Sequence, residues 1–165
     1  FAELFITDAR VPSSAVLGAI DEGWSVATRT LSNERAGVAN LYLGQRRTLD
    51  RLIDAAPKPL SATTRDELVR RYIDVRNLEF LAKRMIGAAL AGRPPGAEGS
   101  VVKLAWSQTG QALAVTGVNV MGADGSWGTS MLSSRQLTIA GGTTEVNKNI
   151  IGERVLGLPK EPAAN

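Results

Sequence analysis

The chain has 165 residues, of which 44% are hydrophobic and 21% charged, and its formal net charge is +3. This size and composition predict one water-compatible domain with a sizeable core. The chain contains no His and no Cys, which excludes a Ser-His-Asp triad, an imidazole base, metal sites built on His or Cys, thiol nucleophiles and disulfides. Catalysis has to use carboxylates, hydroxyls, Lys or Arg, backbone amides or a bound cofactor, and we expect no metal.

The excess positive charge lies in residues 65–93, where bases interleave with acids. Such a pattern is typical of a solvated helix face, with an anionic ligand or partner as the alternative. Nucleic acid is not expected, because no basic run is interleaved with aromatic residues. No segment approaches the roughly 18 consecutive apolar residues of a membrane span. The lack of Cys favours a reducing, cytoplasmic location, and the first residue, Phe1, leads us to expect a piece of a longer protein.

The first half of the chain predicts a strand and two long helices. Residues 1–12 are apolar and aromatic up to Pro12, which favours a short strand. Apolar residues then recur at three- and four-residue spacing from Trp24 to Ala55, which predicts one long helix. A second helix is predicted from Thr64 to Ala91, opened by a capping box between Thr64 and Glu67.

The second half predicts two more helices around a glycine-rich loop. One helix runs from Ser100 to Gly122, a loop follows at 123–130, and a short apolar stretch spans 131–139. The turn Gly141-Gly142 leads into a last helix over 143–156. The fold class is therefore all-α, an up-and-down four-helix bundle with a short N-terminal strand left from a preceding β-domain. The predicted units are the end of that β-domain with its linker (1–20), the bundle (21–159) and a tail (160–165).

Glu34 is the first candidate for chemistry, because it falls on the apolar seam of its helix, between Leu31 and Val38. One interpretation is a carboxylate that reaches out to solvent or pairs with the adjacent Arg35. The other is a desolvated carboxylate that acts as a general base.

The second candidate is the glycine turn at 139–145, which opens onto a helix. Paired glycines let a backbone approach a ligand closely, and unpaired amides at a first helical turn suit an anion or a polarised oxygen. The alternative is a plain loop with Thr143 as the helix cap. The aromatic residues are interpreted as core, with the option that Trp127 covers a ligand.

The motifs at the two ends, in this order, resemble those of the acyl-CoA dehydrogenase family. FITDARVP, LG, EGW and LSNERAGVA resemble the family's passage from its β-domain into its C-terminal helical domain, and TIAGGTTEVNKNIIGERVLGLP resembles its closing signature. PPG before the third helix and VLGLP at the end are similar to actinobacterial-type members. The resemblance implies a FAD-dependent oxidoreductase of lipid metabolism that converts an acyl-CoA thioester to its trans-2-enoyl-CoA, and this fragment alone is expected to be inactive.

The resemblance also assigns roles to residues. Many members carry the catalytic Glu where this chain has Gly141, whereas others place it before an Arg on the first helix of the bundle, which here is Glu34 followed by Arg35. The Gly141 amide would donate to the thioester oxygen. The implied FAD contacts are Gly142, Thr143 and Glu145, and, toward the flavin of a neighbouring subunit, Asn119 and Gly122.

The implied partners are an acyl-CoA substrate, electron-transfer flavoprotein as electron acceptor, and further subunits in a homo- or hetero-oligomer, dimer or tetramer. Two departures from the family pattern support an alternative. The Arg-x-x-Phe-Gly motif that many members carry has no equivalent in 54–63, and Asn119 stands where many have Gln. The alternative function is a non-catalytic partner subunit of a heteromeric acyl-CoA dehydrogenase, and a third interpretation is a free-standing helical interaction module.

Overall fold

The structure, a computed structural model, describes residues 3–36, 40–93 and 96–160, and of residues 31–36 the backbone alone. Within these residues the chain forms helices and turns and no strand. The α-helices are α1 (Gly23–Ala36), α2 (Tyr42–Ala55), α3 (Ala62–Leu90), α4 (Glu98–Met121), α5 (Ser126–Ser133) and α6 (Thr144–Ile150). The chain also forms the 3-10 helices η1 (Ser13–Ala15) and η3 (Ser134–Thr138) and the π-helical turn η4 (Ile151–Val155).

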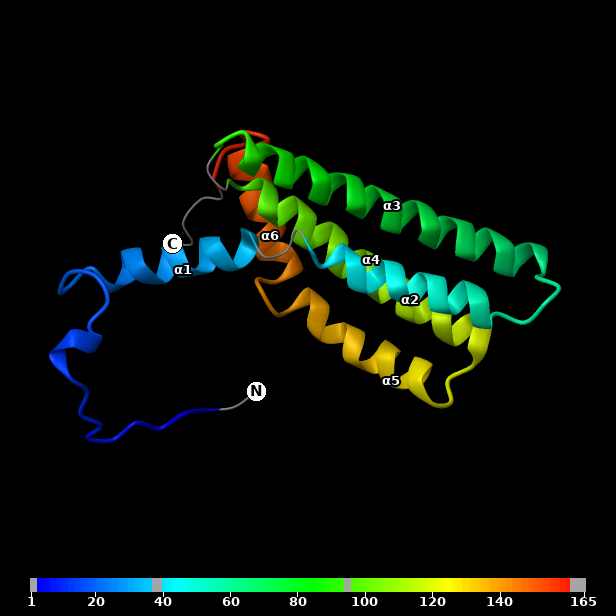
Figure 1. Ribbon diagram of the computed structural model, residues 1–165, viewed down its shortest axis with the longest axis horizontal. Helices are drawn as coiled ribbons and strands as arrows, with labels where there is room; N and C mark the ends of the chain where they lie inside the picture. The colour runs from blue at the N-terminus through cyan, green and yellow to red at the C-terminus, as the bar shows by residue number, and fades with distance from the viewer. Residues whose placement is uncertain (1–2, 37–39, 94–95, 161–165) are drawn as a thin grey trace.

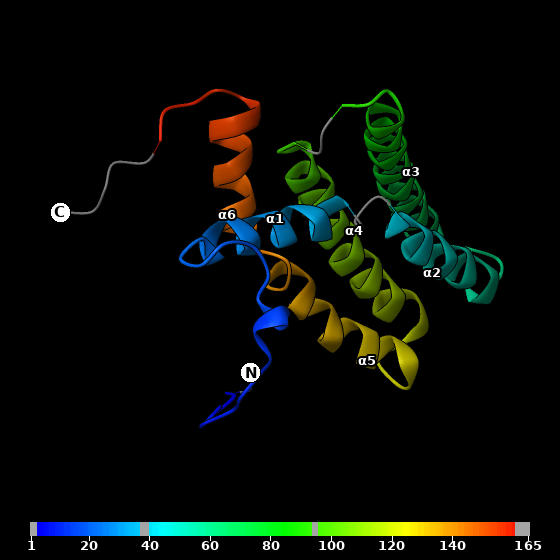
Figure 2. The ribbon, with the colours of Figure 1, turned by 60° about the vertical axis from the view of Figure 1, so that its left-hand side comes forward.

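Helices α2, α3, α4 and α5 form an up-and-down bundle, with each helix antiparallel to the one before it (Figure 1). Helix α4 lies at its centre, because it contacts α2, α3 and α5 as well as α1, α6 and both η3 and η4. Helices α1 and α6 stand at one end of this bundle, as the turned view in Figure 2 shows. The predicted all-α four-helix class is confirmed.

Two predictions for the N-terminal third were wrong. The predicted strand over 1–12 does not form in its described part, residues 3–12, because a strand without a partner has no ladder of hydrogen bonds to hold it. The predicted single helix from Trp24 to Ala55 is two helices, α1 and α2. Asn40 is in a 3-10 turn and Leu41 in a turn before α2 begins, and Asn is a poor helix former.

The predicted fourth helix of the bundle was also misplaced. Its position is taken by α5, which begins inside the segment predicted as a loop, while the predicted last helix is α6 with η4 at the end of the bundle. Trp127 explains this arrangement, because its side chain is only 8% exposed and packs into the main core cluster. A β-carbon on Gly117 of α4 would collide with the Trp127 ring, so this glycine lets α5 approach α4 closely. Trp127 is thus a core residue.

The start of α3 differs by two residues from its prediction, because another residue caps it. Ser61 is the N-cap, and its hydroxyl accepts a hydrogen bond from the Thr64 N–H at 3.0 Å. Thr64, the predicted cap, lies within the first turn of the helix. The remaining core is built from Leu residues of α2 and apolar residues of α3 and α4, with Leu49, Leu52 and Val75 fully buried.

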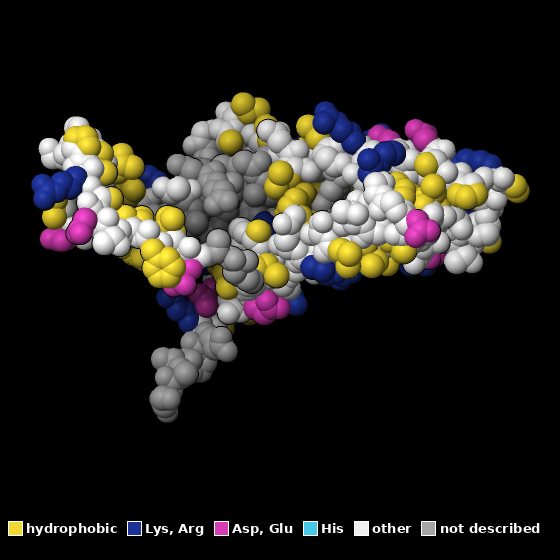
Figure 3. All heavy atoms as spheres, turned by 90° about the horizontal axis from the view of Figure 1, so that it is seen from below, with side chains coloured by type: hydrophobic (Ala, Val, Ile, Leu, Met, Phe, Trp, Pro, Cys, Tyr) yellow, Lys and Arg dark blue, Asp and Glu magenta, His cyan; other side chains and the backbone are white. Residues whose placement is uncertain are grey.

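The surface of the bundle carries interleaved charges, as predicted for residues 65–93. Arg70 pairs with Asp66 at 2.8 Å and Arg71 with Asp74 at 2.9 Å, both along α3. Apolar side chains are exposed at the N-terminal end, which lies at the left of Figure 3. The bundle leaves these side chains uncovered: Leu4, Phe5, Ile6, Val11, Leu17, Ile20 and Trp24.

One carboxylate in α3, that of Glu79, collects three cations. It accepts from Lys83 at 2.7 Å and Arg76 at 2.6 Å, and Arg46 of α2 lies 3.9 Å away. The hydrogen bond from Lys83, followed by the charges of Arg76, Lys83 and Arg46, holds the pKa of Glu79 below its usual value. This ion-pair cluster joins α2 to α3.

We expect Glu79→Gln to lower the stability of the protein at pH 7 and to flatten its loss of stability in acid. A carboxyl whose pKa is lowered in the folded state stabilises the fold above its unfolded pKa and stops doing so as the pH falls through the folded value. Thermal unfolding between pH 7 and pH 3 checks this, with Glu98→Gln at the exposed start of α4 as the control. A variant whose stability falls with acid as steeply as the wild type contradicts the prediction.

Candidate functional site

The turn between η3 and α6 contains the predicted glycine pair. Gly141 and Gly142 have φ of +68° and +97°, in the left-handed region that disfavours other residues. A β-carbon on Gly142 would lie 3.1 Å from Asn147 Nδ2, so both its conformation and its surroundings favour glycine. Gly141 is exposed, and no acceptor in the described part of the chain takes its N–H or that of Gly142. The turn therefore presents free backbone donors at the surface.

Two buried side chains bind the carbonyl oxygens of this turn. Lys103 of α4 donates from Nζ to Gly142 O at 2.6 Å and to Leu137 O at 3.0 Å. Asn147 of α6 donates from Nδ2 to Gly142 O and to Thr143 O, both at 2.9 Å. Lys103 is 4% and Asn147 1% exposed. Burial lowers the pKa of Lys103, while the two carbonyl oxygens that accept from it favour the protonated form.

The residues after the glycines open α6. Thr143 is the N-cap, and its hydroxyl accepts from the Val146 N–H at 3.2 Å. The same hydroxyl keeps its own proton to donate elsewhere. Glu145 lies exposed in the first turn of α6. The capping role proposed for Thr143 as the alternative interpretation is therefore present, and it leaves a donor for a ligand.

Asn119 and Gly122 lie at the other end of α4. Asn119 is exposed, and its Nδ2 is 3.5 Å from Glu67 Oε2 of α3. Gly122 ends α4 with φ of +88°, and its N–H donates to Val118 O at 2.8 Å. At 1.5 Å per residue, Asn119 is about 24 Å along the helix from Lys103. Within this chain the structure thus does not bring the two sets of predicted cofactor residues together.

The predicted base and its neighbour lie in the last turn of α1. Residues Glu34 and Arg35 are helical, but their side chains lie outside the described residues. Helix α1 contacts α4, the helix that also carries Lys103. The catalytic roles of Glu34 and Arg35 stay predictions.

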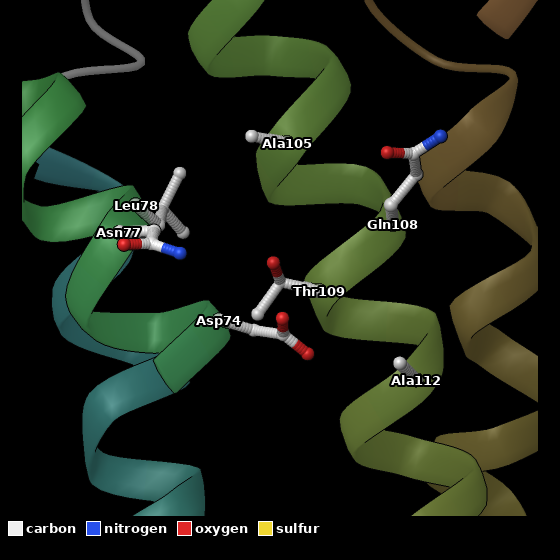
Figure 4. Close-up of a pocket in the computed structure, with 7 residues that line it drawn as sticks. All are labelled: Asp74, Asn77, Leu78, Ala105, Gln108, Thr109 and Ala112. Carbon is white, nitrogen blue, oxygen red and sulfur yellow. The ribbon is translucent and has the colours of Figure 1, made fainter. Parts of the chain in front are cut away.

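Two grooves open on the described surface, and neither contains a predicted site residue. A groove of about 290 Å³ between α3 and α4 is shown in Figure 4, where Asp74 and Thr109 point toward one another and Gln108 points to the far side of α4. A groove of about 430 Å³ lies among α2, α4, α5 and η3, with Gln45 and Trp106 in its wall. The glycine turn lines neither of these grooves, whereas Trp127, considered above as a cover for a ligand, lines the second.

The described residues hold no cluster of three or more Asp or Glu that could bind a metal ion. None of the helices, as far as the structure describes them, is long and apolar enough to cross a membrane.

The sequence analysis missed Lys103 and Asn147, the two buried residues that bind the glycine turn. No sequence signal pointed to Lys103, because the helical face that it shares with Ser100 and Ser107 is polar and only the structure shows that this face is buried.

Comparison with known proteins places the chain in a family. The family described as "Acyl-CoA dehydrogenase, C-terminal domain" matches residues 21–156. The chain is 36% identical to the acyl-CoA dehydrogenase IpdE1 of Mycobacterium tuberculosis and 34% identical to the acyl-CoA dehydrogenase FadE34 of the same organism. These alignments cover 98% and 97% of this chain but 45% and 23% of the relatives. The chain thus spans less than half the length of the curated relatives it matches.

The fold agrees with this match. The Tcur3481-Tcur3483 steroid ACAD has a TM-score of 0.84 to this structure at 23% identity, over 95% of this chain and 45% of that chain. The family match covers most of the chain, including EGW, LSNERAGVA and nearly all of the closing motif, whereas FITDARVP and LG precede the matched residues. The chain belongs to the acyl-CoA dehydrogenase family, whose members are flavoproteins, and residues 21–156 match the family's C-terminal helical domain.

Proposed function

We propose that this chain is the catalytic C-terminal part of a FAD-dependent acyl-CoA dehydrogenase, which converts an acyl-CoA thioester to its trans-2-enoyl-CoA. The observation that carries the proposal is the turn at Gly141-Gly142 in a chain of this family. It offers free N–H donors at the surface and is held by two buried side chains. Such a fixed donor is suited to an oxygen that gains negative charge during a reaction.

The α-proton of the substrate is removed by Glu34. In a chain without His or Cys, a carboxylate is the best available proton acceptor at neutral pH. The Gly141 N–H donates to the thioester oxygen, which gains negative charge as the α-proton leaves. Arg35, the next residue in the sequence, is assigned a supporting role beside this base.

The residues of the closing motif fit part of a flavin site. Gly142, Thr143 and Glu145 combine a free N–H, a hydroxyl proton and a carboxylate at the start of α6, which is a donor and acceptor set suited to polar groups of FAD. When bound, FAD accepts the β-hydride of the substrate. Along α4, Asn119 lies about 24 Å and Gly122 about 28 Å from Lys103, which binds this turn, so we assign them to the FAD of a neighbouring subunit in a dimer or tetramer.

Within this proposal the acceptor of electrons is electron-transfer flavoprotein and the location is cytoplasmic. The substrate is an acyl-CoA whose acyl part is set by residues beyond this chain. The solved structure reported above is that of a steroid ACAD, so a test panel includes acyl-CoAs with steroid side chains beside straight and branched ones.

A second candidate function is that of a non-catalytic partner subunit. The observation that favours it is the sequence 54–63, which has no Arg-x-x-Phe-Gly motif, together with Asn119 in place of Gln. In this case the bundle supports the flavin site and the assembly of a related chain.

Purification of the full-length protein, alone and with a co-expressed related chain, separates the two functions. If this chain is catalytic, it carries FAD and oxidises an acyl-CoA of the panel when purified alone. The partner function is supported if this chain is colourless and inactive when purified alone but active in complex with its partner. In that case replacing Glu34 by Gln leaves the complex active, because the partner chain supplies its own base. Absence of flavin and of acyl-CoA affinity under both conditions contradicts both.

A further inference from the structure

Lys103 is an unusual buried charge in this domain. Its side chain is 4% exposed, and among the described residues no carboxylate lies within ion-pair distance of it. The other buried charged side chain in the described part, Glu79, has three cations around it. Burying an ammonium group without a counter-charge is costly unless hydrogen bonds replace its water. The two carbonyl oxygens that accept from Nζ provide that replacement.

These two carbonyls belong to the two ends of one turn. Leu137 lies in η3, and Gly142 comes just before the cap of α6, so a single ammonium joins both ends of the segment that contains Gly141. A β-carbon on Gly141 would lie 3.6 Å from Lys103 Cε. The stem of Lys103 therefore lies beneath Gly141 while its Nζ binds the carbonyls on either side.

Asn147 extends the same attachment to α6. Its Nδ2 shares Gly142 O with Lys103 Nζ, so α4 and α6 meet at one carbonyl oxygen. Within the turn, the N–H groups of Ile139 and Ala140 both donate to Gln136 O, at 3.0 and 2.9 Å. With its carbonyls directed inward in this way, the turn leaves the N–H of Gly141 without an internal acceptor.

We propose that Lys103 is a positioning residue for the reaction: by binding the carbonyl oxygens of Leu137 and Gly142 it sets the direction of the Gly141 N–H that faces the substrate oxygen. The inference rests on the proposed function for that N–H. A compact ammonium with three donors suits this place better than the larger planar guanidinium of Arg. Because donors act catalytically only when they are aimed at the developing charge, loosening the turn lowers the rate more than it weakens binding.

Two substitutions test the proposal in the full-length protein. Lys103→Met keeps the apolar stem and removes charge and donors, and Lys103→Gln keeps a shorter amide donor. We expect kcat for acyl-CoA oxidation to fall about tenfold to a hundredfold in Lys103→Met and less in Lys103→Gln, with KM nearly unchanged. Lys148→Met, an exposed lysine on α6, is the matched control and retains wild-type kcat.

Hydrogen exchange gives a readout that does not depend on activity. In Lys103→Met the amides of Ile139, Ala140 and Val146 should exchange faster, while those of α2 and α3 keep their wild-type rates. If exchange also rises in α2 and α3, Lys103 supports the whole fold and the positioning role is wrong. The same comparison of the turn with α2 and α3 applies to Lys103→Gln. Unchanged exchange in the turn, or unchanged kcat in an active enzyme, also overturns the proposal. If only the turn exchanges faster but the wild-type protein oxidises no acyl-CoA, Lys103 still fixes the turn. The proposed function is then the part that is contradicted.

Discussion

We expect the Glu34→Gln variant of the full-length protein to oxidise acyl-CoA about a thousandfold more slowly than the wild type. Gln has nearly the same shape as Glu but no basic oxygen, so it cannot take the α-proton, and a positioned base contributes 10²–10⁴-fold in such reactions. Flavin content should stay unchanged, because the residues proposed to hold FAD lie at the end of α4 and in the turn that opens α6, rather than in the last turn of α1.

Two measurements separate the base from a general effect on folding. Steady-state oxidation with an artificial acceptor gives kcat, and incorporation of deuterium at the α-carbon of the substrate, followed by mass spectrometry, reports proton removal by itself. Both rates should fall together. Glu22→Gln, just before the start of the same helix, serves as the control and should match the wild type. Turnover within about twofold of the wild type in Glu34→Gln would assign the base to another residue.

Replacing Leu52 with Ala should destabilise the bundle by about 3 kcal/mol, within the 2–5 kcal/mol that such a change usually costs. Leu52 is fully buried where α2 packs into the main core cluster with Leu49, Leu68 and Trp127. Removing its methyl groups leaves a cavity that helices held by so many contacts cannot close. An effect of this size changes the unfolding equilibrium by more than a hundredfold.

Urea unfolding followed by circular dichroism measures this loss. Leu132→Ala makes the same chemical change at a side chain that is 72% exposed on α5, and it should alter stability by less than about 0.5 kcal/mol. Equal effects of the two substitutions would contradict the core assignment of Leu52. At a temperature where it stays folded, Leu52→Ala should keep the wild-type kcat, because it does not touch the glycine turn.

The helices of the bundle were largely predictable, and the departures have local causes. Periodic apolar residues and flanking glycines and prolines predicted α3 and α4 to within two residues. Helix α5 was missed because Gly125 and Gly128 suggest a loop, and local propensity does not include the burial of Trp127 against Gly117. The strand over 1–12 was predicted from propensity alone, which does not supply a pairing partner.

In the candidate site, too, some features could be predicted from the sequence and others could not. The glycine turn and its cap, Thr143, were visible as a motif, and the structure confirms their conformation. Lys103 was not singled out, since a lysine in a helix is usually solvated and its partners are backbone oxygens far away in sequence. The functional roles assigned to these residues all stay predictions: Glu34, Arg35, Gly141, Gly142, Thr143, Glu145, Asn119 and Gly122.

By itself the sequence determined the chemical limits and the family. The absence of His and Cys leaves carboxylates, hydroxyls, Lys or Arg, backbone amides and a cofactor. Two terminal motifs in the right order indicate the acyl-CoA dehydrogenase C-terminal domain, and the family match confirms it. Only the tertiary structure decided which helix completes the bundle and that Lys103 and Asn147 hold the turn at Gly142. The physical reason is that close packing and hydrogen bonds to backbone oxygens join residues distant in the chain, and neither leaves a periodic pattern in the sequence.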